Sequence, residues 1–345
     1  MQIKRHHRPL FVCWVAVATL LVTSVGALAI SPPTSYRVDV LAYVPAAREI
    51  AVCGGTLFVG TKRSTIYAVP ITGGRAVQAA TGFVAPNGVA CQGNKLYVAS
   101  RDRISAFTVT SRGVLADRVD IHKGLPPSAE HSLRYIGVGP DGRLYVSLGS
   151  PCNICQPRGL QGTIVSLSPN GGDVRRLAWG VRNSVGFDWN GGTLYFTDNG
   201  ADGMGDNIPP DELNKLEPGG FYGFPFFGGR IRLPGFETAT PPATPIAPIY
   251  EFQAHVATLG IHFYRGSMFP ELRGETLIAE HGSWDRSVPV GYEVVRLRIG
   301  ANRSGNGERL VNGIGRPVDV KELPDGSIVV SDDTGGRIWR ISRKP

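Results

Sequence analysis

The sequence DGRLYVS at residues 141–147 decides the fold, because five further copies of its pattern recur along the chain. Each copy places a glycine at a turn and follows it with four or five residues that favour strands. Units of about 40–50 residues built from antiparallel strands are typical of a β-propeller. The sequence therefore predicts an all-β fold, a six-bladed β-propeller. The other copies are GGTLFVG (54–60), GNKLYVA (93–99), GGTLYFT (191–197), RGETLIA (273–279) and DGSIVVS (325–331).

One interval between the repeats is much longer than the others. The central apolar residues of successive copies are 39, 48, 50, 83 and 51 positions apart. The interval of 83 predicts an insertion at about residues 198–260, which we expect on the channel face. Loops from all blades meet at the mouth of the central channel, so we expect the functional site there. The residues used for this alignment are Leu57, Leu96, Leu144, Leu194, Leu277 and Ile328.

The composition agrees with a turn-rich β-protein. The 345 residues include 45 Gly and 26 Pro, and both residue types are unfavourable in helix interiors. Hydrophobic residues make up 42%, which is enough to build a core and excludes a disordered chain. The formal net charge of +8 comes from scattered residues, and no Lys/Arg run alternates with aromatic side chains. We therefore expect no nucleic-acid partner.

The N-terminus has the pattern of a secretory signal. A basic leader at residues 4–8 precedes an apolar run from Leu10 to Ile30, which ends in Ala27-Leu28-Ala29. This pattern predicts a signal peptide over residues 1–29, followed by a propeller domain over residues 30–345. About twenty apolar residues can also span a bilayer, so an uncleaved N-terminal anchor is the alternative. Both readings place the domain in the periplasm or outside the cell, with contact to a membrane only through such an anchor.

Export to an oxidising compartment favours disulfides for the cysteines of the domain. Cys53 and Cys91 occupy corresponding places in the first two repeats, so we expect a bridge between neighbouring blades. Cys152 and Cys155 form a single CxxC motif in a loop with prolines, and no second pair of ligands has a spacing suited to zinc. We expect a local disulfide there.

Two polar stretches precede the third and fourth repeats. Glu130 and His131 are neighbours, and a histidine beside a carboxylate can act as a base near neutral pH. A histidine in a β-protein is also commonly a structural hydrogen-bonding residue. Arg182 offers a planar guanidinium that binds carboxylates through two hydrogen bonds, and Asn183 adds a donor and an acceptor. A salt bridge that closes a blade is the structural alternative for this arginine.

Further charged residues gather in the later repeats. Five carboxylates fall within residues 198–212, among Gly and Asn, which suits calcium because it takes six to eight oxygen ligands. Arg286 and Arg316, together with Arg182, would place arginines from three blades around one channel, and this suits a planar polyanion. No GxGxxG motif opens a helix after a strand, and no GxSxG elbow is present. Nicotinamide cofactors and serine hydrolysis are therefore disfavoured.

These stretches together resemble the soluble glucose/sorbosone dehydrogenase family, the pyrroloquinoline quinone (PQQ)-dependent aldose sugar dehydrogenases. The resemblance implies a six-bladed propeller and an exported PQQ- and calcium-dependent oxidoreductase. It implies oxidation of the anomeric or aldehyde carbon of an aldose-type sugar by hydride transfer to the quinone, with a quinone or a cytochrome as electron acceptor. From about residue 130 to 340, the matching stretches are EHSLRYIGVGPDGRLYVSLGS, GVRNSVGFDWNGGTLYFTDNGADGMGDNIPPDELN, AEHGSWDRSVPVGY and GRPVDVKELPDGSIVVSDD.

The resemblance also implies roles for individual residues. His131 matches the catalytic base that takes the proton from the sugar hydroxyl, and Glu130 matches its neighbouring acid. The positions that match cofactor-binding residues are Arg182, Asn183, Arg286 and Arg316. The positions that match calcium ligands are Gly200 and Ala201, through their carbonyls, for the ion of the cofactor, and Glu212 and the Tyr222 carbonyl for a second, structural ion.

Two departures from the family pattern concern the cofactor. Val318 stands where the soluble glucose enzymes carry a second arginine, and Pro86-Asn87-Gly88-Val89 stands where they have a glutamine. Fewer groups then complement a tricarboxylate, which weakens PQQ binding or removes it. A non-catalytic propeller that binds a sugar or a partner protein therefore stays open, as does a calcium-dependent lactonase on a similar propeller. The lactonase would need one metal ion held by carboxylates in the channel and no ring of arginines.

Overall fold

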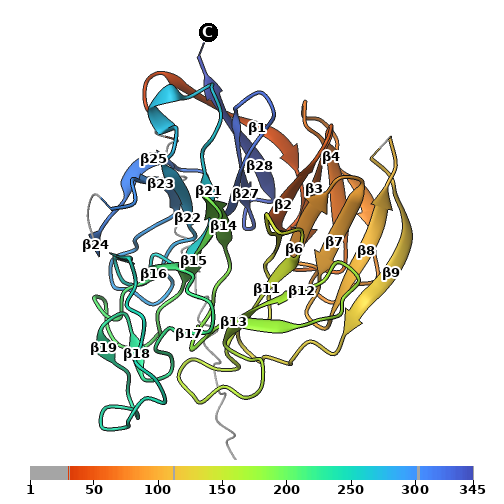
Figure 1. Cartoon of the computed structure of the whole chain (residues 1–345). Coiled ribbons are helices and arrows are strands. Elements are labelled where there is room, and N and C mark those ends of the chain that lie inside the picture. The colour runs from red at the N-terminus through yellow and green to blue at the C-terminus, as the bar shows by residue number, and fades with distance from the viewer. Residues whose placement is uncertain (1–29, 31, 112, 301–303, 345) are drawn as a thin grey trace, which may run out of the picture.

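The structure is a computed structural model, and it describes residues 30, 32–111, 113–300 and 304–344. Six sheets of these residues stand around a central axis as the blades of a propeller (Figure 1). The six-bladed all-β fold predicted from the repeats is confirmed. None of the helices in the described part of the chain has the length and apolar character needed to span a bilayer. The predicted signal peptide, residues 1–29, lies outside the described residues.

Each blade is built around four antiparallel strands. In blades 1 to 5 the innermost strand is the first strand of the blade along the chain, and in blade 6 it is β26. These innermost strands lie against those of the neighbouring blades. Blades 1 to 3 contain β2 (Ala47–Cys53), β3 (Thr56–Thr61), β4 (Ile66–Pro70) and β5 (Val77–Ala80); β6 (Gly88–Gln92), β7 (Lys95–Ala99), β8 (Arg103–Val109) and β9 (Leu115–Lys123); and β10 (Ile136–Val138), β11 (Leu144–Leu148), β12 (Thr163–Leu167) and β13 (Arg175–Trp179). Blades 4 to 6 contain β14 (Phe187–Asn190), β15 (Thr193–Asp198), β16 (Glu212–Lys215) and β20 (Tyr250–Phe252); β21 (Thr258–Phe263), β22 (Thr276–Glu280), β23 (Glu293–Leu297) and β25 (Glu308–Asn312); and β26 (Pro317–Glu322), β27 (Ile328–Asp332), β28 (Arg337–Arg343) and β1 (Tyr36–Tyr43).

The repeats of the sequence form the second strand of each blade together with the turn that precedes it. The second strand has a neighbouring strand on each side, and its apolar side chains pack between sheets, so this position selects strand-forming, apolar residues. The six aligned residues are at most 2% exposed. They are Leu57, Leu96, Leu144, Leu194, Leu277 and Ile328.

The two ends of the domain close the ring in the same blade. Strand β1 pairs antiparallel with β28, from Tyr36 opposite Arg343 to Tyr43 opposite Arg337. Blade 6 therefore combines one N-terminal strand with three C-terminal strands. The pairing joins the first described strand to the last and leaves no gap between blades 6 and 1 (Figure 1).

The inserted segment is narrower than the predicted residues 198–260, because two strands of blade 4 lie inside that interval. Residues 199–211 form the connection between β15 and β16. Residues 216–249, between β16 and β20, form the longer excursion from the sheet. They contain β17 (Gly220–Phe221), which extends blade 3 by pairing in parallel with β13. The remaining short elements are the hairpin of β18 (Phe227–Gly228) and β19 (Ile231–Arg232), strand β24 (Ser304–Gly305) and the 3-10 helix η1 (Pro270–Leu272).

Both predicted disulfides are present. Cys53 at the end of β2 is bonded to Cys91 in β6, which links blades 1 and 2 across a sequence separation of 38. Cys152 and Cys155 are bonded within the loop between β11 and β12. One bridge thus joins two blades, and the other closes a short loop.

Candidate active site

One cavity of about 290 Å³ lies at the end of the channel where the innermost strands begin. In an antiparallel blade the chain returns to this end after the second strand. The loops before the first strands and after the second strands therefore meet there, and five of the six blades contribute residues. The lining residues are Arg48, Lys62, Glu130, His131, Leu133, Arg182, Asn183, Val185, Asn199, Gly200, Asp202, Asp211, His255, Ala257, Leu259, His281, Trp284, Asp285 and Arg316.

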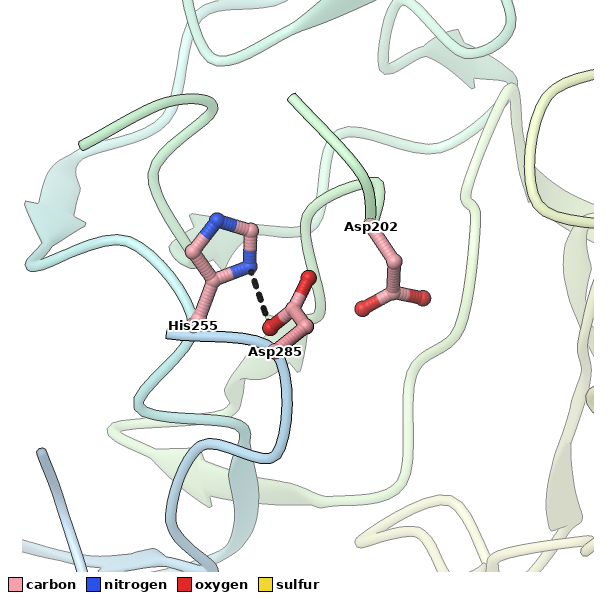
Figure 2. A group of neighbouring side chains, drawn as sticks. All are labelled: Asp202, His255 and Asp285. Atoms are coloured by element: carbon pink, nitrogen blue, oxygen red, sulfur yellow. Dashed lines mark ion pairs between the residues drawn. The ribbon is translucent and has the colours of Figure 1, made fainter. Parts of the chain in front are cut away.

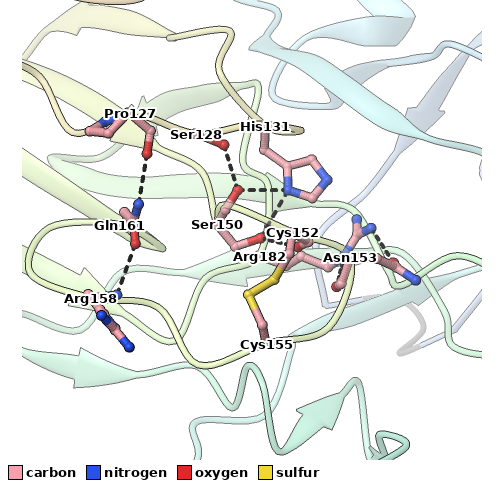
Figure 3. The surroundings of a disulfide bond; sticks show 10 residues. All are labelled: Pro127, Ser128, His131, Ser150, Cys152, Asn153, Cys155, Arg158, Gln161 and Arg182. Atoms are coloured by element: carbon pink, nitrogen blue, oxygen red, sulfur yellow. Dashed lines mark hydrogen bonds between the residues drawn. A yellow bond between two sulfur atoms is a disulfide. The ribbon is translucent and has the colours of Figure 1, made fainter.

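His131 is held in one tautomer by the loop that follows β11. Its Nδ1 lies 3.0 Å from the Ser150 carbonyl oxygen and 2.9 Å from Ser150 Oγ (Figure 3). A carbonyl can only accept, so Nδ1 carries the hydrogen and Nε2 keeps a lone pair. Burial, with a further contribution from the charge of Arg182, lowers the pKa of His131 to about 3. The imidazole is therefore neutral at ordinary pH and able to accept a proton.

A glycine makes room for this histidine. A Cβ atom on Gly149 would lie 2.5 Å from His131 Cβ and 2.7 Å from the His131 carbonyl oxygen. Real Cβ atoms do not approach other atoms so closely, so any other residue would displace the histidine. Gly149 thus fixes how near the two loops can pass.

Arg182 and Asn183 are positioned by an aspartate at the end of β15. Their backbone N–H groups donate to the two carboxylate oxygens of Asp198, at 2.9 and 2.6 Å. Burial raises the pKa of Asp198 to about 7 despite these hydrogen bonds. The Arg182 side chain is only 5% exposed and donates to Asn153 and Asp202. Its guanidinium is thus fixed at the cavity wall by protein acceptors.

The loop closed by Cys152 and Cys155 supports both sides of this arrangement. Ser150 Oγ, which accepts from His131, donates to the Cys152 carbonyl at 2.8 Å. Asn153, between the two cysteines, accepts from Arg182 through its carbonyl at 3.0 Å and through Oδ1 at 2.7 Å (Figure 3). The disulfide loop therefore holds the histidine on one side and the arginine on the other.

The opposite wall contains a second histidine between two charged groups. Arg316 donates through Nη2 to His281 Nδ1 at 3.0 Å and to the Gly282 carbonyl at 2.7 Å. His281 Nε2 in turn donates to Asp333 Oδ1 at 3.1 Å. Burial lowers the pKa of His281 to about 4, so it is neutral and transmits the orientation of Asp333 to Arg316.

Two cations of blade 1 reach the same wall. Arg48 is buried, with Nε donating to Asn87 Oδ1 at 2.7 Å and Nη1 to Asp333 Oδ2 at 3.1 Å. Lys62 forms an ion pair with Asp333, and its side chain is 44% exposed. Asn87 is buried and does not line the cavity. It therefore orients Arg48 and makes no contact with the cavity itself.

The floor of the cavity is apolar. Val185 and Leu259 line it and pack against Val318, which is fully buried. Val318, at the position where a second arginine was expected, thus closes the floor. The positive charge absent there is present on the wall in Arg48 and Lys62.

Comparison with known proteins identifies the chain. The sequence profile of the glucose/sorbosone dehydrogenase family matches residues 93–340, which is more than half of the sequence. The chain belongs to the glucose/sorbosone dehydrogenase family. A protein of Borreliella burgdorferi described as uncharacterized is 38% identical over 316 residues, covering 83% of each chain.

Several solved structures share the fold of this family member. The PQQ domain of pyranose dehydrogenase from Coprinopsis cinerea has a TM-score of 0.78 at 18% identity, covering 91% of this chain and 97% of that one. A carbohydrate-active enzyme of family AA12 from Trichoderma reesei has a TM-score of 0.77 at 20% identity, covering 92% and 98%. The soluble aldose sugar dehydrogenase of Escherichia coli has a TM-score of 0.69 at 17% identity, covering 90% and 100%.

The cavity brings together residues from all four stretches that the sequence singled out. Glu130 is exposed at the rim, and the others lie deeper in the wall. Segments 199–211 and 253–257, at the two ends of the predicted insertion, contribute lining residues, whereas residues 216–249 do not. The predicted site residues that line the cavity are Glu130, His131, Arg182, Asn183, Gly200 and Arg316.

Four predicted residues lie outside the cavity lining. The Arg286 guanidinium donates to the carbonyls of Asp206 and Ala254, so it fixes two loops to each other and does not face the cavity. Ala201 is buried, although its neighbour Gly200 lines the cavity. Glu212 and Tyr222, predicted for a separate ion, are also buried.

Arg48, Lys62 and His255 line the wall but were not predicted from the sequence, and His281 lies in the stretch AEHGSWDRSVPVGY without an assigned role. Arg48 lies within the inner strand β2 and His281 directly follows the second strand β22, so both are polar residues at an apolar strand and carry a recognisable signal. Lys62 carries the same signal, because it directly follows the second strand β3, whereas His255 lies in the connection between β20 and β21, which contains no motif. Their proximity follows only from closure of the ring.

Proposed function

We propose that this family member is an exported PQQ- and calcium-dependent oxidoreductase that oxidises the anomeric or aldehyde carbon of an aldose-type sugar. One observation carries the proposal: a neutral histidine, His131, lies in one cavity with Arg182, Asn183 and Arg316. A base and a set of cationic, planar donors are what oxidation of a sugar by a polyanionic quinone requires.

His131 would remove the proton from the sugar. Its Nδ1–H is engaged by Ser150, so the lone pair on Nε2 is the one available to a hydroxyl group. The low pKa keeps this lone pair free down to pH values well below neutrality. Glu130 at the rim offers a carboxylate that accepts from further sugar hydroxyls.

The cavity walls fit a planar polyanion. PQQ, when bound, supplies the quinone that accepts the hydride. Lys62 is partly exposed, and Arg316 uses Nε and Nη2 on protein acceptors, which leaves Nη1 for a ligand carboxylate. Asn183 and Asn199 line the adjoining wall and could bind the oxygens of the quinone. Arg48 adds a buried positive charge behind this wall.

The backbone at Gly200 and Ala201 fits the calcium ion of the cofactor. Among the described residues, neither carbonyl accepts a backbone hydrogen bond, so both remain available as oxygen ligands. A Cβ on Gly200 would lie 2.7 Å from the Pro210 carbonyl oxygen, so the close passage of the two segments requires glycine. We assign the calcium of the cofactor to these two carbonyls.

Buried oxygens around Glu212 fit a second, structural calcium. Strand pairing places Asp198, Glu212 and Glu251 opposite one another across β15, β16 and β20. Asn214 Oδ1 and Glu251 Oε1 are buried and accept no hydrogen bond. A cation at this place would satisfy them, and the Tyr222 carbonyl is proposed as its further ligand.

Export to the periplasm or beyond the cell agrees with the two disulfides, which persist in oxidising compartments. In such a compartment a quinone or a cytochrome would accept the electrons. The substrate would be a small sugar, since the cavity holds about 290 Å³.

Reconstitution tests the function. Metal-free protein would be incubated with PQQ and Ca²⁺ and assayed with a panel of aldoses and an artificial electron acceptor. We expect sugar-dependent reduction of the acceptor, and a higher PQQ concentration for half-maximal activity in Arg316→Gln. Arg175→Gln, on the exposed outer edge of blade 3, serves as the matched control. PQQ binding without sugar oxidation would favour a binding protein, and lactone hydrolysis with calcium alone would favour a lactonase.

A further inference from the structure

Three potential metal ligands converge in the cavity wall at a place that the calcium sites do not use. Asp202, His255 and Asp285 each offer one ligand atom, and these atoms lie within 4.8 Å of one another. They come from three separate connections, after β15, after β20 and after β22. Figure 2 shows the Asp285 carboxylate between the imidazole of His255 and the carboxylate of Asp202.

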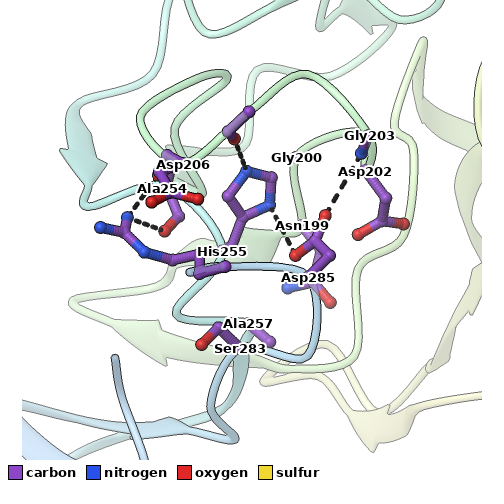
Figure 4. A network of polar contacts seen from close by, with 12 residues as sticks. Asn199, Gly200, Asp202, Gly203, Asp206, Ala254, His255, Ala257, Ser283 and Asp285 are labelled. Carbon is purple, nitrogen blue, oxygen red and sulfur yellow. Dashed lines mark hydrogen bonds and ion pairs between the residues drawn. The ribbon is translucent and has the colours of Figure 1, made fainter. Parts of the chain in front are cut away.

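The hydrogen bonds of His255 define which nitrogen faces the carboxylates. Nε2 lies 2.8 Å from the Gly205 carbonyl oxygen, so Nε2 carries the hydrogen (Figure 4). Nδ1 then faces Asp285 Oδ1 at 3.4 Å. That oxygen is buried and accepts no hydrogen bond. Two electron-rich atoms face each other, and a positive group must lie between them, either a proton on Nδ1 or a metal ion.

The separation accommodates a metal ion. A charge-assisted N–H···O hydrogen bond would bring nitrogen and oxygen to about 2.7–2.9 Å. Two ligands at about 2.0–2.2 Å from a tetrahedral ion lie about 3.4 Å apart. The observed 3.4 Å between His255 Nδ1 and Asp285 Oδ1 matches the second geometry. His262 and Asp188 lie at a similar distance of 3.3 Å, but Asp188 Oδ2 accepts from the Phe263 N–H, whereas Asp285 Oδ1 accepts no hydrogen bond.

The ligand types select the metal. Calcium takes oxygen ligands, whereas a site with one imidazole and two carboxylates suits zinc or another first-row divalent ion. We propose that Asp202, His255 and Asp285 bind one such transition-metal ion in the cavity wall. This site is chemically distinct from the carbonyl cradle at Gly200 and Ala201 and does not depend on the proposed sugar oxidation.

Each ligand is already oriented by the protein. The backbone at His255 has a φ of 68°, in the left-handed region that non-glycine residues seldom adopt. The Gly203 N–H donates to Asp285 Oδ2 at 3.2 Å, which leaves Oδ1 for the ion. Arg182 donates to Asp202 Oδ2 at 2.9 Å, which leaves the other oxygen of Asp202. Such outer contacts orient metal ligands and usually strengthen binding.

The contact with Arg182 gives the site a role in the cavity. Asp202 is shared between the guanidinium and the proposed ion. An ion that withdraws charge from Asp202 would weaken the hold of this carboxylate on Arg182 and leave the guanidinium freer to bind a ligand carboxylate. Occupancy of the metal site would therefore tune the affinity of the cavity for anions.

Metal titration of the full chain tests the proposal without PQQ or sugar. Tag-free, metal-free protein would be titrated with Zn²⁺ by calorimetry, and with Co²⁺ because its visible absorption reports on nitrogen and oxygen ligation. We expect one Zn²⁺ per chain, bound with higher affinity than Ca²⁺. His255→Gln and Asp285→Asn should each weaken Zn²⁺ binding by about 10–100-fold or more and alter the Co²⁺ spectrum.

Two matched variants control for other ligands. His262→Gln removes a histidine that lies between Asp188 and Glu322, but whose two nitrogens face these carboxylates on opposite sides and so cannot share one ion with both. Asp206→Asn removes a half-buried carboxylate that accepts from Ser287 on the neighbouring loop. Both should bind Zn²⁺ as the unaltered protein does. Equal affinity in His255→Gln, Asp285→Asn and the unaltered protein, with all of them folded by circular dichroism, would overturn the proposal. So would a folded, unaltered protein without Zn²⁺ affinity, because a proton would then occupy the gap.

Discussion

Blades 2 and 4 have the same strand order, yet they differ in what joins their strands. In blade 2 the second and third strands are joined by residues 100–102, and the blade gives no residue to the cavity. In blade 4 the corresponding connection is residues 199–211, and blade 4 with its flanking loops supplies Arg182, Asn183 and Asp211. The sheets therefore build the ring, and the length of the connections at one end determines which blades contribute chemistry.

The difference also concerns how buried polar groups are satisfied. Strand pairing satisfies the backbone of blade 2, whereas the loops of blade 4 depend on buried carboxylates. Asp211 accepts from the N–H groups of Gly200 and Ala257, at 2.7 and 2.6 Å. Burial raises the pKa of Asp211 to about 6, because the charged form of the carboxylate is disfavoured in this buried position. A site of this kind positions groups at a cost in stability that the regular blades do not carry.

The largest expected effect on turnover comes from removing the proposed base, His131. His131→Gln should lower turnover by about 10²–10⁴-fold, because no group remains to accept the proton of the sugar. KM for the sugar and the melting temperature should change little, since the proton moves only in the transition state. Steady-state kinetics on reconstituted enzyme measure both quantities.

The matched control is His122→Gln. His122 lies in β9 of blade 2 and also bonds a carbonyl, that of Gly171 at 2.9 Å, but it does not line the cavity. Its turnover should equal that of the unaltered enzyme. A similar loss in both variants would mean that the contrast between the two blades is not functional.

Substitutions in the regular blades should lower the free energy of unfolding and leave turnover unchanged. Replacing Cys53 and Cys91 with serine opens a loop of 38 residues, which costs about 4 kcal/mol of unfolding free energy in the chain-entropy model. We expect a clear decrease in the denaturation midpoint, with turnover per folded molecule unchanged. Chemical denaturation followed by fluorescence measures the midpoint, and an unchanged midpoint would contradict the expectation.

The other disulfide should show the reverse pattern. Its cysteines are 3 residues apart, so replacing both with serine costs only about 2 kcal/mol in the same treatment. Ser150 and Asn153 would lose their fixed positions, however, and they hold His131 and Arg182. Turnover should fall by up to about 10²-fold, as expected when catalytic groups are displaced by about 1 Å. Normal kinetics in this variant would show that the loop is ordered without its disulfide.

The smallest effect concerns a buried carboxyl group beside the site. Burial, with the nearby charges of Glu293 and Asp211, raises the pKa of Glu280 to about 8. The folded state then holds a proton that the unfolded chain releases near pH 4, so stability from this group is present at low pH and is lost as pH rises through about 8. The melting temperature should therefore fall between about pH 5 and 8 and level off above pH 8, and Glu280→Gln should flatten that fall by a few degrees. An identical pH dependence in Glu280→Gln would contradict this assignment.

Much of the fold could be predicted from the sequence, because a strand between two neighbours must present apolar residues after a tight turn. Leu96 and Leu194 lie in repeats of this kind, and both are at most 2% exposed. Residues of the site could be predicted from the sequence only where polar residues flank such a repeat, as for His131 and Arg182. Arg286 lies in the same kind of stretch, but its loop turns the guanidinium toward backbone carbonyls. No pattern along the chain specifies such a turn.

The positively charged residues at the cavity also could not be predicted fully from the sequence. Val318 suggested a deficit of positive charge, and Asn87 suggested a weakened contact with the cofactor. In the structure Asn87 orients Arg48, which approaches the cavity from the opposite end of the sequence to Arg316. Arg48 can supply positive charge near Arg316 only because the ring closes, and no pattern along the sequence indicates which distant residues closure brings together.

Closure of the ring through β1 and β28 also constrains when folding of the propeller can be completed. The partner of Tyr36 is Arg343, so the first strand cannot pair fully until residue 343 is available. Contacts of such long sequence separation form slowly, because the chain entropy of a very large loop must be lost first. Strand β1 therefore stays unpaired until β28 is available, and any chain that stops before β28 would keep that edge open to other strands. Pairing of Arg337–Arg343 with β1 is therefore the step that completes the propeller.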